Sequence, residues 1–576
     1  MLVRIWFSDN ILTHQDKSLS VVFATRRWRV NLWQVLPFLI AVLVSVPALV
    51  VLVHLAYPMG EVWQHLADTV LSRYVINTVW LALGVGVIGL FIGGGTAWLC
   101  ANCRFPGRSL FEWALLLPLA VPTYAIAYSY AGLLEYAGPV QSSLRAVFGW
   151  SRGDYWFPEI HSLPGAILVM AFVLYPYVYL LGRAGFLGQS GSASEISRTL
   201  GRGPWRTFFA ISLPLARPAM IAGIALMIME ALSDFGAVQY LGVDTFTTGI
   251  YRTWFALGAP QAAAQLSAIL LLFVFAAMLM EQWSRGRARY YQVTGRDRLS
   301  RGIQLRGMSA VLAVIACFVP LALGFLVPSA QLVLWTIESW SEVIDKRFIE
   351  YAWHSVSLAA LTSALALFLA LALRYSLRIG GGWGSRLCIR FAGLGYAVPG
   401  SVIAVGVLLP FGFVDRTVDE FAREWFGVST GLIFTGGIAV MVFGYLVRFL
   451  AVALGAVESA MDKISPQLDD AARTLGCGPG QRLWRLHVPL LFNGLVTGGL
   501  LVFVDVMKEL PATLILRPFN FDTLAVRAFE LASDELLAES ACASLAIVVV
   551  GLIPVIVLSH AVGHFNHAMP RVGDAA

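Results

Sequence analysis

The 576-residue sequence has few charged residues and few cysteines, and each shortage excludes a class of protein. Only 13% of the residues are charged and 58% are apolar, whereas soluble domains carry about 25% charged residues. A water-soluble globule could not bury so much apolar surface. The six cysteines are scattered, and the one CxxC, from Cys100 to Cys103, has no second pair nearby. A zinc or redox site is therefore not indicated.

Lysine is scarce as well, and none of the few lysines follows a glycine. A phosphate-binding Walker A loop needs Gly-Lys followed by Ser or Thr. We therefore expect that this chain does not hydrolyse ATP, and we predict no catalytic residue, no metal site and no cofactor bound by this chain.

Long apolar runs are what the sequence has in abundance. A helix needs about 20 apolar residues to cross a bilayer. Twelve runs meet this need, near residues 33–56, 75–99, 111–133, 163–182, 217–238, 262–282, 308–334, 353–375, 390–411, 431–456, 490–513 and 541–562. Most of the 40 Lys and Arg residues fall on alternate connections, on the side that holds both termini. The positive-inside rule then places both termini in the cytoplasm and explains the basic pI without nucleic acid.

The second half of the sequence repeats the first at a nearly constant offset. Ala120-Val-Pro122 returns as Ala397-Val-Pro399, and Arg198-Thr-Leu-Gly201 returns as Arg473-Thr-Leu-Gly476. Equal helix numbers at a constant offset imply two halves in parallel orientation, a plan that transporters use. We predict an all-α protein of about 12 transmembrane helices in two parallel six-helix repeats. The expected divisions are a cytoplasmic N-terminal segment (1–30), a first half (31–284), a cytoplasmic basic linker (285–306), a second half (307–564) and a cytoplasmic tail (565–576).

Each half has one long cytoplasmic connection between its fourth and fifth helices, with the same spacing in both copies. An acid, a leucine, a glycine and a proline mark it, at Glu195, Leu200, Gly201 and Pro214 and again at Asp470, Leu475, Gly476 and Pro489. The acid suits the first turn of a short helix, the glycine a turn, and the proline is expected to end a second helix. The pattern predicts a docking surface for two copies of one partner. The alternative is an interfacial helix that lies on lipid headgroups.

This spacing resembles the EAA loop of ABC importer permeases, which reads Glu-Ala-Ala, three residues, Gly, nine residues, a hydrophobic residue, any residue and Leu-Pro. We call the regions near 190–216 and 462–490 the first and second EAA loops. The resemblance implies a type I importer permease fold, in a bacterial inner membrane. It also implies two copies of an ABC ATPase, which bind ATP and Mg, and one periplasmic substrate-binding protein. Ile196-Ser197 departs from Ala-Ala, and Asp470 replaces Glu.

Acids and arginines follow the two EAA loops at matched positions. The acids in the fifth helices are Glu230 and Asp234 in the first half and Asp505 and Glu509 in the second. Acids inside a membrane line a water-filled route or pair with neighbours, and both readings stay open. Arg252 and Arg527, on the expected periplasmic side, would close a gate, meet an anion or bind the delivery protein.

The stretch Glu230-Ala-Leu-Ser-Asp234-Phe-Gly and the fusion of both halves resemble the ferric-iron permeases. That resemblance implies ferric iron, a hard cation that prefers oxygen ligands. Thiamine and phosphonate permeases share this plan, so these cargoes remain alternatives. So does an ion-coupled secondary transporter, for which the acids would be coupling sites. A membrane enzyme is disfavoured because the histidines are dispersed, and His560, His564 and His567, although on one helix face, are not expected to bind metal.

Overall fold

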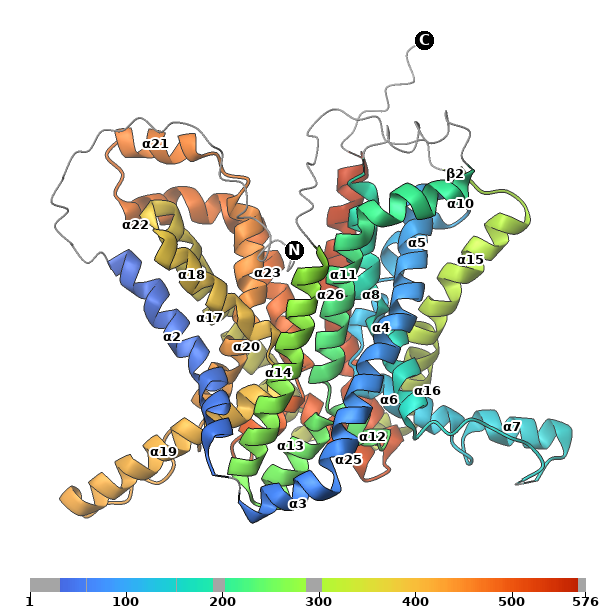
Figure 1. Ribbon diagram of the computed structural model, residues 1–576, viewed down its shortest axis with the longest axis horizontal. Helices are drawn as coiled ribbons and strands as arrows, with labels where there is room; N and C mark the ends of the chain where they lie inside the picture. The colour runs from blue at the N-terminus through green and yellow to red at the C-terminus, as the bar shows by residue number, and fades with distance from the viewer. Residues whose placement is uncertain (1–31, 59, 152, 190–202, 286–302, 568–576) are drawn as a thin grey trace, which may run out of the picture. The chain divides into compact units, whose positions relative to one another are not determined.

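The computed structural model describes residues 32–58, 60–151, 153–189, 203–285 and 303–567, almost all of them helical (Figure 1). Eleven helices are long and apolar enough to cross a membrane. The number rises to twelve if the bent pair Arg108–Ala120 and Thr123–Phe148 forms one span. The prediction of an all-α protein with about twelve membrane helices is confirmed.

Two compact units make up the fold, and neither coincides with one half of the sequence. Unit 1 takes in the chain up to Val50, Val356–Val398 and Gly406–Met507. Unit 2 takes in Val51–Ser355, Pro399–Val405 and the chain from Lys508. Each unit thus combines segments of both sequence halves. The five divisions of the chain that the sequence repeat indicated stay a prediction.

Unit 1 packs the first helix of the described residues against helices of the second half. A Cβ on Gly406 would lie 2.3 Å from the carbonyl oxygen of Pro47, so the close approach of these two helices requires glycine. Three helices lie mainly in unit 1 and extend into unit 2, namely α2 (Leu32–Val53), α17 (Lys346–Gly380) and α19 (Gly400–Phe426). The other elements of unit 1 are α18 (Trp383–Ala392), η5 (Gly393–Ala397), α20 (Ile438–Met461), α21 (Pro466–Thr474), α22 (Pro479–Arg482), η6 (Leu483–His487) and α23 (Val488–Met507).

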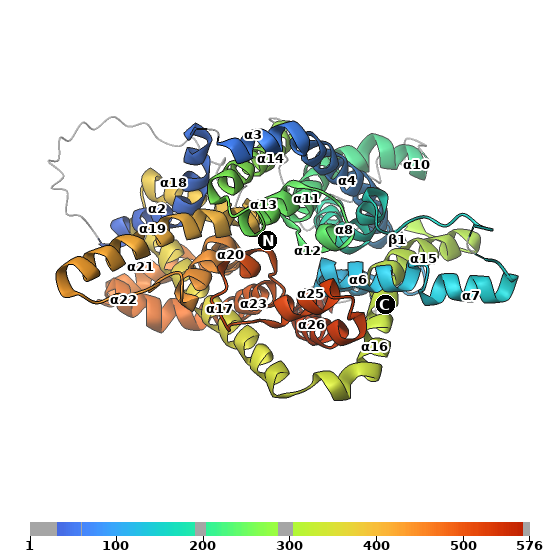
Figure 2. The same ribbon diagram turned by 90° about the horizontal axis from the view of Figure 1, so that it is seen from below.

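Unit 2 is built around α4, α8 and α11, which pack through small residues. A Cβ on Gly93 of α4 would lie 2.7 Å from the carbonyl oxygen of Tyr175 in α8, so these backbones touch. Helix α16 lies beside α26 (Figure 2). A two-residue parallel ladder pairs Cys103 with Ile303 and Arg104 with Gln304.

The helices and strands of unit 2, in chain order, are η1 (His54–Ala56), α3 (Glu61–Thr69), α4 (Leu71–Asn102), β1 (Cys103–Arg104), α5 (Arg108–Ala114), η2 (Leu117–Ala120), α6 (Thr123–Leu134), α7 (Pro139–Phe148), α8 (Leu163–Leu187), α10 (Pro204–Thr207), η3 (Phe208–Ser212), α11 (Leu213–Ser233), α12 (Gly236–Tyr240), α13 (Phe246–Phe255), α14 (Pro260–Arg285), β2 (Ile303–Gln304), α15 (Met308–Leu321), η4 (Ala322–Leu326), α16 (Val327–Val343), α24 (Pro511–Leu516), α25 (Leu524–Ser533) and α26 (Leu537–His567).

The repeated Ala-Val-Pro motif breaks a helix in each half. Val121 has ψ 129° and Val398 has ψ 125°, both extended, and a new helix begins directly after each proline. Proline disfavours the helical conformation of the residue before it and lacks an N–H to bond. The expectation of unbroken helices near 111–133 and 390–411 is therefore wrong.

The fifth helix of each half is broken as well. Helix α11 ends at Ser233, Asp234 turns extended with ψ 137°, and the short α12 begins at Gly236. In the second half α23 ends at Met507 and the short α24 begins at Pro511. The expectation of continuous helices near 217–238 and 490–513 is wrong for the same reason in both halves: an acid caps a new helix.

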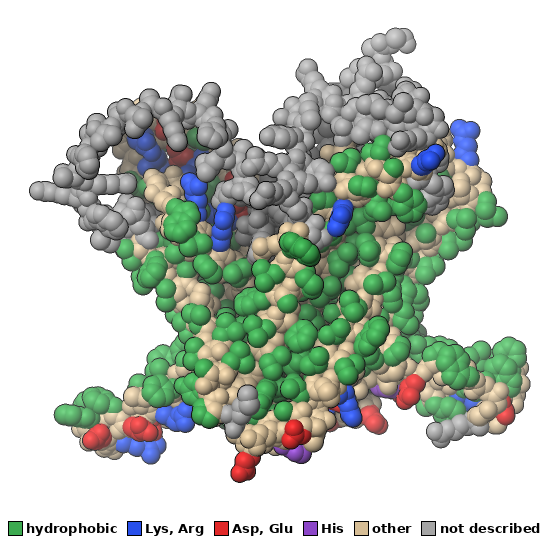
Figure 3. Space-filling model, in the orientation of Figure 1, with side chains coloured by type: hydrophobic (Ala, Val, Ile, Leu, Met, Phe, Trp, Pro, Cys, Tyr) green, Lys and Arg blue, Asp and Glu red, His purple; other side chains and the backbone are tan. Residues whose placement is uncertain are grey.

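Hydrophobic side chains dominate the outer surface along the long helices, and charged side chains gather near helix ends (Figure 3). Among the exposed residues are Phe91 of α4 and Leu279 of α14. A soluble protein rarely exposes so large an apolar surface. The chain is a multi-pass membrane protein.

Candidate functional site

The second EAA loop lies entirely within the described residues, whereas the decisive part of the first does not. Glu195, Leu200 and Gly201 lie outside the described residues, so their role stays a prediction. The chain resumes with α10 and η3, which lead into α11. The geometry of an EAA loop is therefore described from the second copy.

Helix α21 forms the exposed part of the second EAA loop. The hydroxyl of Ser465 caps it by accepting from the N–H of Gln467 at 3.3 Å. Gly476 ends it with φ +79°, a left-handed conformation that favours glycine. The N–H of Cys477 then bonds the carbonyl of Ala472 at 3.0 Å. The predicted short helix followed by a glycine turn is present.

The two residues predicted to contact a partner lie on the outside of α21. The side chain of Asp470 is 71% exposed, and Leu475 is 82% exposed. Arg473 lies beside Asp470, with 3.8 Å between Nη1 and Oδ1, in a solvated ion pair worth little. An exposed acid and an exposed leucine, five residues apart in the second EAA loop, suit a partner that supplies a basic and an apolar contact.

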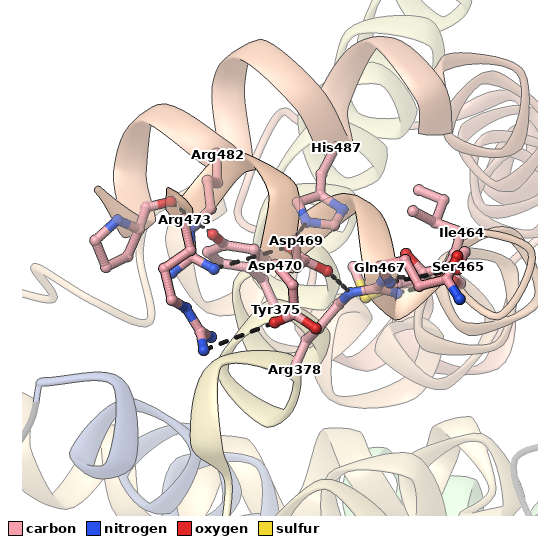
Figure 4. A network of polar contacts seen from close by, with 12 residues as sticks. Tyr375, Arg378, Ile464, Ser465, Gln467, Asp469, Asp470, Arg473, Arg482 and His487 are labelled. Carbon is pink, nitrogen blue, oxygen red and sulfur yellow. Dashed lines mark hydrogen bonds and ion pairs between the residues drawn. The ribbon is translucent and has the colours of Figure 1, made fainter. Parts of the chain in front are cut away.

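A neighbouring acid that the sequence analysis did not select, Asp469, faces inward (Figure 4). Its Oδ2 accepts from Nε of Arg378 at 2.6 Å, and its Oδ1 lies 2.7 Å from Nε2 of the fully buried His487. Arg482 adds a more distant charge, 3.9 Å from Oδ1. Burial alone would raise the pKa of Asp469, but hydrogen bonds from Arg378 and His487, together with their charges, outweigh burial and hold it below its usual value.

Arg378 ties the loop to the end of a membrane helix. It lies near the end of α17 and also donates to the carbonyls of Met461 at 3.1 Å and Ile464 at 2.8 Å, where the loop begins. One turn earlier in α17, the hydroxyl of Tyr375 donates to the carbonyl of Pro479 at 2.6 Å. The loop is therefore fixed to α17 on both sides of α21, at its start and at Pro479 (Figure 4).

The prolines after the EAA spacing do not end a helix. A π-helical turn, η6, precedes Pro489, and the N–H of Val488 bonds the carbonyl of Leu483, five residues back. The same turn, η3, precedes Pro214 in the first half. The wider turn lets the helix pass a residue without an N–H. The expectation that Pro214 and Pro489 end the second helix is therefore wrong, and α22, η6 and α23 run on continuously.

Asp234 and Glu509 cap the broken helices of unit 2. Asp234 accepts from the hydroxyl of Thr123 and, at 2.8 Å, from the N–H of Ala237. Glu509 accepts from the N–H of Ala512 at 3.1 Å. Asp234 lies two residues before α12 and Glu509 two residues before α24, where the free N–H groups and the dipole of the next helix favour a carboxylate.

The two capped breaks meet at Gly236. A Cβ on Gly236 would lie 2.7 Å from Cδ2 of Leu510 and 2.8 Å from Cβ of Tyr124, so this contact requires glycine. Thr123 and Tyr124 open α6, directly after the break at the first Ala-Val-Pro motif. Three helix breaks of unit 2 thus share one contact. The other two matched acids, Glu230 and Asp505, are half-buried one turn before the caps.

The matched arginines lie in different ion pairs. Nη2 of Arg252 is 3.2 Å from Oδ1 of Asp244, which also pairs with Arg73. Nη1 of Arg527 is 4.0 Å from Oε2 of Glu530, whereas Nη2 of Arg517 is 2.8 Å from Oε1 of the same glutamate. Arg517 also pairs with Asp522. Both matched arginines thus pair with acids of this chain, and their gate or docking role stays a prediction.

The comparisons with known proteins agree with the repeat. The family model described as "Binding-protein-dependent transport system inner membrane component" matches residues 87–290 and again residues 362–569. The Fe(3+)-transport system permease protein FbpB 2 of Haemophilus influenzae is 26% identical over 503 residues, which cover 85% of this chain and 90% of that protein. The molybdenum transport system permease protein ModB of Escherichia coli is 31% identical over 202 residues, 33% of this chain and 85% of ModB.

Proposed function

Because the chain belongs to the family of binding-protein-dependent transport system inner membrane components, we propose that it forms the membrane passage of an ATP-driven importer for ferric iron. Membership confirms the resemblance drawn from the EAA spacing. The observation that supports ATPase coupling best is the second EAA loop, where Asp470 and Leu475 protrude while Asp469 is bound inside.

The proposed partners follow from the family and from the two EAA loops. One ABC ATPase subunit would dock on each loop, and ATP and Mg would bind to those subunits alone. A periplasmic binding protein would deliver the cargo from the opposite face. In this arrangement both termini would lie on the cytoplasmic side of a bacterial inner membrane, as the distribution of Lys and Arg favours.

The geometry of the second EAA loop supports a mechanical role. A partner that pulls on α21 would also pull on α17, because Arg378 joins Asp469 to the carbonyls where the loop begins. A loosely tethered loop would bend instead and lose the motion. ATP-driven closure of the ATPase dimer would then rock the helices toward the outward-open state, and hydrolysis would reset them. This is alternating access powered from the cytoplasmic side.

Iron is proposed as cargo because three of the relatives that align along most of this chain are named for Fe(3+) or ferric transport. The oxygen-rich acids Glu230 and Asp505, half-buried beside the helix breaks, suit passage of a hard cation. Selection would rest with the delivery protein, so these acids would guide cargo rather than hold it. Within the described ranges no three His, Cys, Asp or Glu side chains lie close enough to hold a metal ion.

The test is uptake of radioactive ferric iron into vesicles that contain the full chain, its ATPase and its binding protein. The wild type should accumulate iron only when ATP is present on the side of the membrane where the ATPase is bound. The double variant Glu195→Lys plus Asp470→Lys should abolish uptake by reversing charge at both loops. Asp534→Lys, which reverses the charge of another exposed acid outside the loops, is the control and should transport normally.

The outcomes separate the parts of the proposal. Iron uptake without any ATPase would refute the ATP-driven importer. ATP-dependent uptake of thiamine or a phosphonate, with iron ignored, would refute only the cargo. Equal uptake by the double variant and the control would refute docking at the EAA loops.

A further inference from the structure

The last turns of α19 carry one apolar face that no part of the described chain covers. Val414, Val418, Phe421 and Trp425 recur at intervals of four, three and four residues, which places them along one side of a helix. Phe421 is 54% exposed and Trp425 is 70% exposed. We call residues 413–426 the α19 arm.

Charged residues occupy the other side of the α19 arm. Arg416, Asp419, Glu420 and Arg423 point away from the apolar stripe by helical spacing. In the space-filling view, hydrophobic side chains cover one side of this end of α19 and charged side chains the other (Figure 3). Both signs of charge are mixed along the polar side, so the arm has no strongly cationic or anionic patch that would recruit a charged macromolecule.

Two acids of the α19 arm hold the returning chain against it. Asp419 accepts from the N–H groups of Thr430 at 2.8 Å and Gly431 at 3.1 Å. Asp415 accepts from the N–H groups of Phe434 at 2.9 Å and Thr435 at 2.8 Å. Backbone groups that enter the apolar edge of a bilayer must be bonded internally. These four bonds satisfy backbone N–H groups on both sides of the exposed Leu432 and Ile433. Without the bonds, those N–H groups would be costly to remove from water.

The place of the α19 arm in unit 1 fixes which membrane face it meets. Helix α20 begins at Ile438, after the arm, and ends at Met461, before the second EAA loop. Its 24 residues cross a bilayer once, because a helix rises about 1.5 Å per residue. The arm and the second EAA loop therefore lie at opposite faces. The arm is the last part of α19, whose 27 residues are together apolar enough to be a candidate membrane helix, so its apolar stripe belongs to a helix suited to lipid.

From this geometry we propose that the α19 arm lies in the bilayer surface opposite the second EAA loop, with its apolar stripe among the upper acyl chains and its charged side in water. Trp and Phe are typical of this boundary, where an apolar ring meets the headgroups. A helix with a clean apolar face and a strongly polar one lies in the interface rather than crossing it. The occupant of the exposed stripe is thus phospholipid, and the proposal does not depend on the cargo.

The first half carries a similar element at the matched place, before its fourth helix. In α7, Val140, Leu144 and Val147 recur at intervals of four and three residues, and Val147 is strongly exposed. The guanidinium of Arg145 is 3.9 Å from the ring centroid of Tyr136 and stays off this stripe. The recurrence in unit 2 supports the same role for α7 and gives the permease one such arm in each sequence half.

The test uses a fluorescent thiol label on single added cysteines of the full chain, reconstituted in vesicles whose phospholipids carry a nitroxide near the headgroup end of one acyl chain. Phe421→Cys probes the apolar stripe, and Glu420→Cys, one residue away, is the matched control on the charged side. Four of the six native cysteines are buried, and labelling of the unsubstituted chain gives the background. We expect at least about twofold stronger quenching at the first position than at the second.

Trp425→Cys should repeat the result, because it lies on the same stripe as Phe421. Equal quenching at the two positions, or a fully water-exposed label at Phe421→Cys, would overturn the proposal. Weak lipid quenching at Phe421→Cys together with strong shielding by added binding protein would also overturn it, in favour of a protein-docking face. All these positions are exposed, so folding should be preserved in each variant.

Discussion

The second EAA loop and the helix breaks of unit 2 use their acids differently. In the loop, two adjacent aspartates divide the work: Asp469 is bound to Arg378 and His487, and Asp470 faces outward. At the breaks, both predicted pathway acids that follow the fifth helices, Asp234 and Glu509, bond backbone N–H groups of the next helix. One region therefore leaves an acid exposed at the surface, whereas the other uses its acids to bond its own backbone.

The difference teaches that the local backbone decides what a carboxylate does. At a helix break several N–H groups lack partners, and the nearest acid bonds them. In the continuous helix α21, Ser465 caps the first turn, so Asp470 remains available at the surface.

The largest effect is expected at Asp469. Asp469→Ala leaves the partly buried Arg378 and the fully buried His487 without their carboxylate, which costs about 3 kcal/mol of loop stability. Amide hydrogen exchange in α21 should then speed up by about 100-fold, because local opening is governed by that free energy. The measurement is exchange followed by mass spectrometry on the full chain. Asp470→Ala is the matched control and should leave the rate within about twofold; equal acceleration by both variants would contradict the division of roles.

A smaller loss of stability is expected at the helix break. Asp234→Ala removes the acceptor for the Thr123 hydroxyl and the Ala237 N–H, and should lower the free energy of unfolding by about 2 kcal/mol. Asp234→Asn keeps an acceptor oxygen and should lose less than half of that. Thermal unfolding in detergent compares them. If Asp234→Asn is as damaging as Asp234→Ala, the negative charge itself is required and capping is not the main role.

A still smaller effect is expected at the matched arginines. A double-mutant cycle between Arg517 and Glu530 should give a coupling of about 0.5–1 kcal/mol, and one between Arg527 and Glu530 should give about zero. The reason is distance, 2.8 Å against 4.0 Å. A larger coupling for Arg527 would show that the repeat preserves the ion pair as well as the position.

The smallest effect is expected from pH. The pKa of Asp469 is lowered in the folded loop, so the stability it contributes is present above the unfolded value, about 3.9, and is lost as pH falls through the lower folded value. Exchange of α21 amides, corrected for the intrinsic pH dependence, should therefore stay constant from pH 8 to about pH 5. A marked acceleration within that range would show that another group controls the loop.

Much of this architecture could be predicted from local sequence signals. Apolar runs indicated the membrane helices, and a fixed spacing indicated α21 with its glycine turn at Gly476. The Ala-Val-Pro motif was recognised only as a repeat, although the conformational restriction by proline could have indicated the breaks at Val121 and Val398.

The remaining features depend on contacts between distant segments. Asp469 finds His487 18 residues away and Arg378 91 residues away, and its spacing in the sequence indicates neither partner. The grouping of α2 with helices of the second half in unit 1 could not be predicted from the sequence repeat either, because a repeat shows which segments are equivalent and not which are in contact. The cargo is harder still to predict from the sequence, because a membrane passage needs no tight binding site.

The most direct test of the account is the affinity of the purified ATPase for the full chain in nanodiscs, measured for the wild type, Asp470→Lys, Asp469→Ala and the control Asp534→Lys. We expect Asp470→Lys and Asp469→Ala each to weaken binding by at least about tenfold. Asp470→Lys would remove a contact with the ATPase, and Asp469→Ala would disorder the loop. Asp534→Lys should leave the affinity unchanged. Unchanged binding for both loop variants would contradict the claim that the second EAA loop, held by Asp469, is where the ATPase docks.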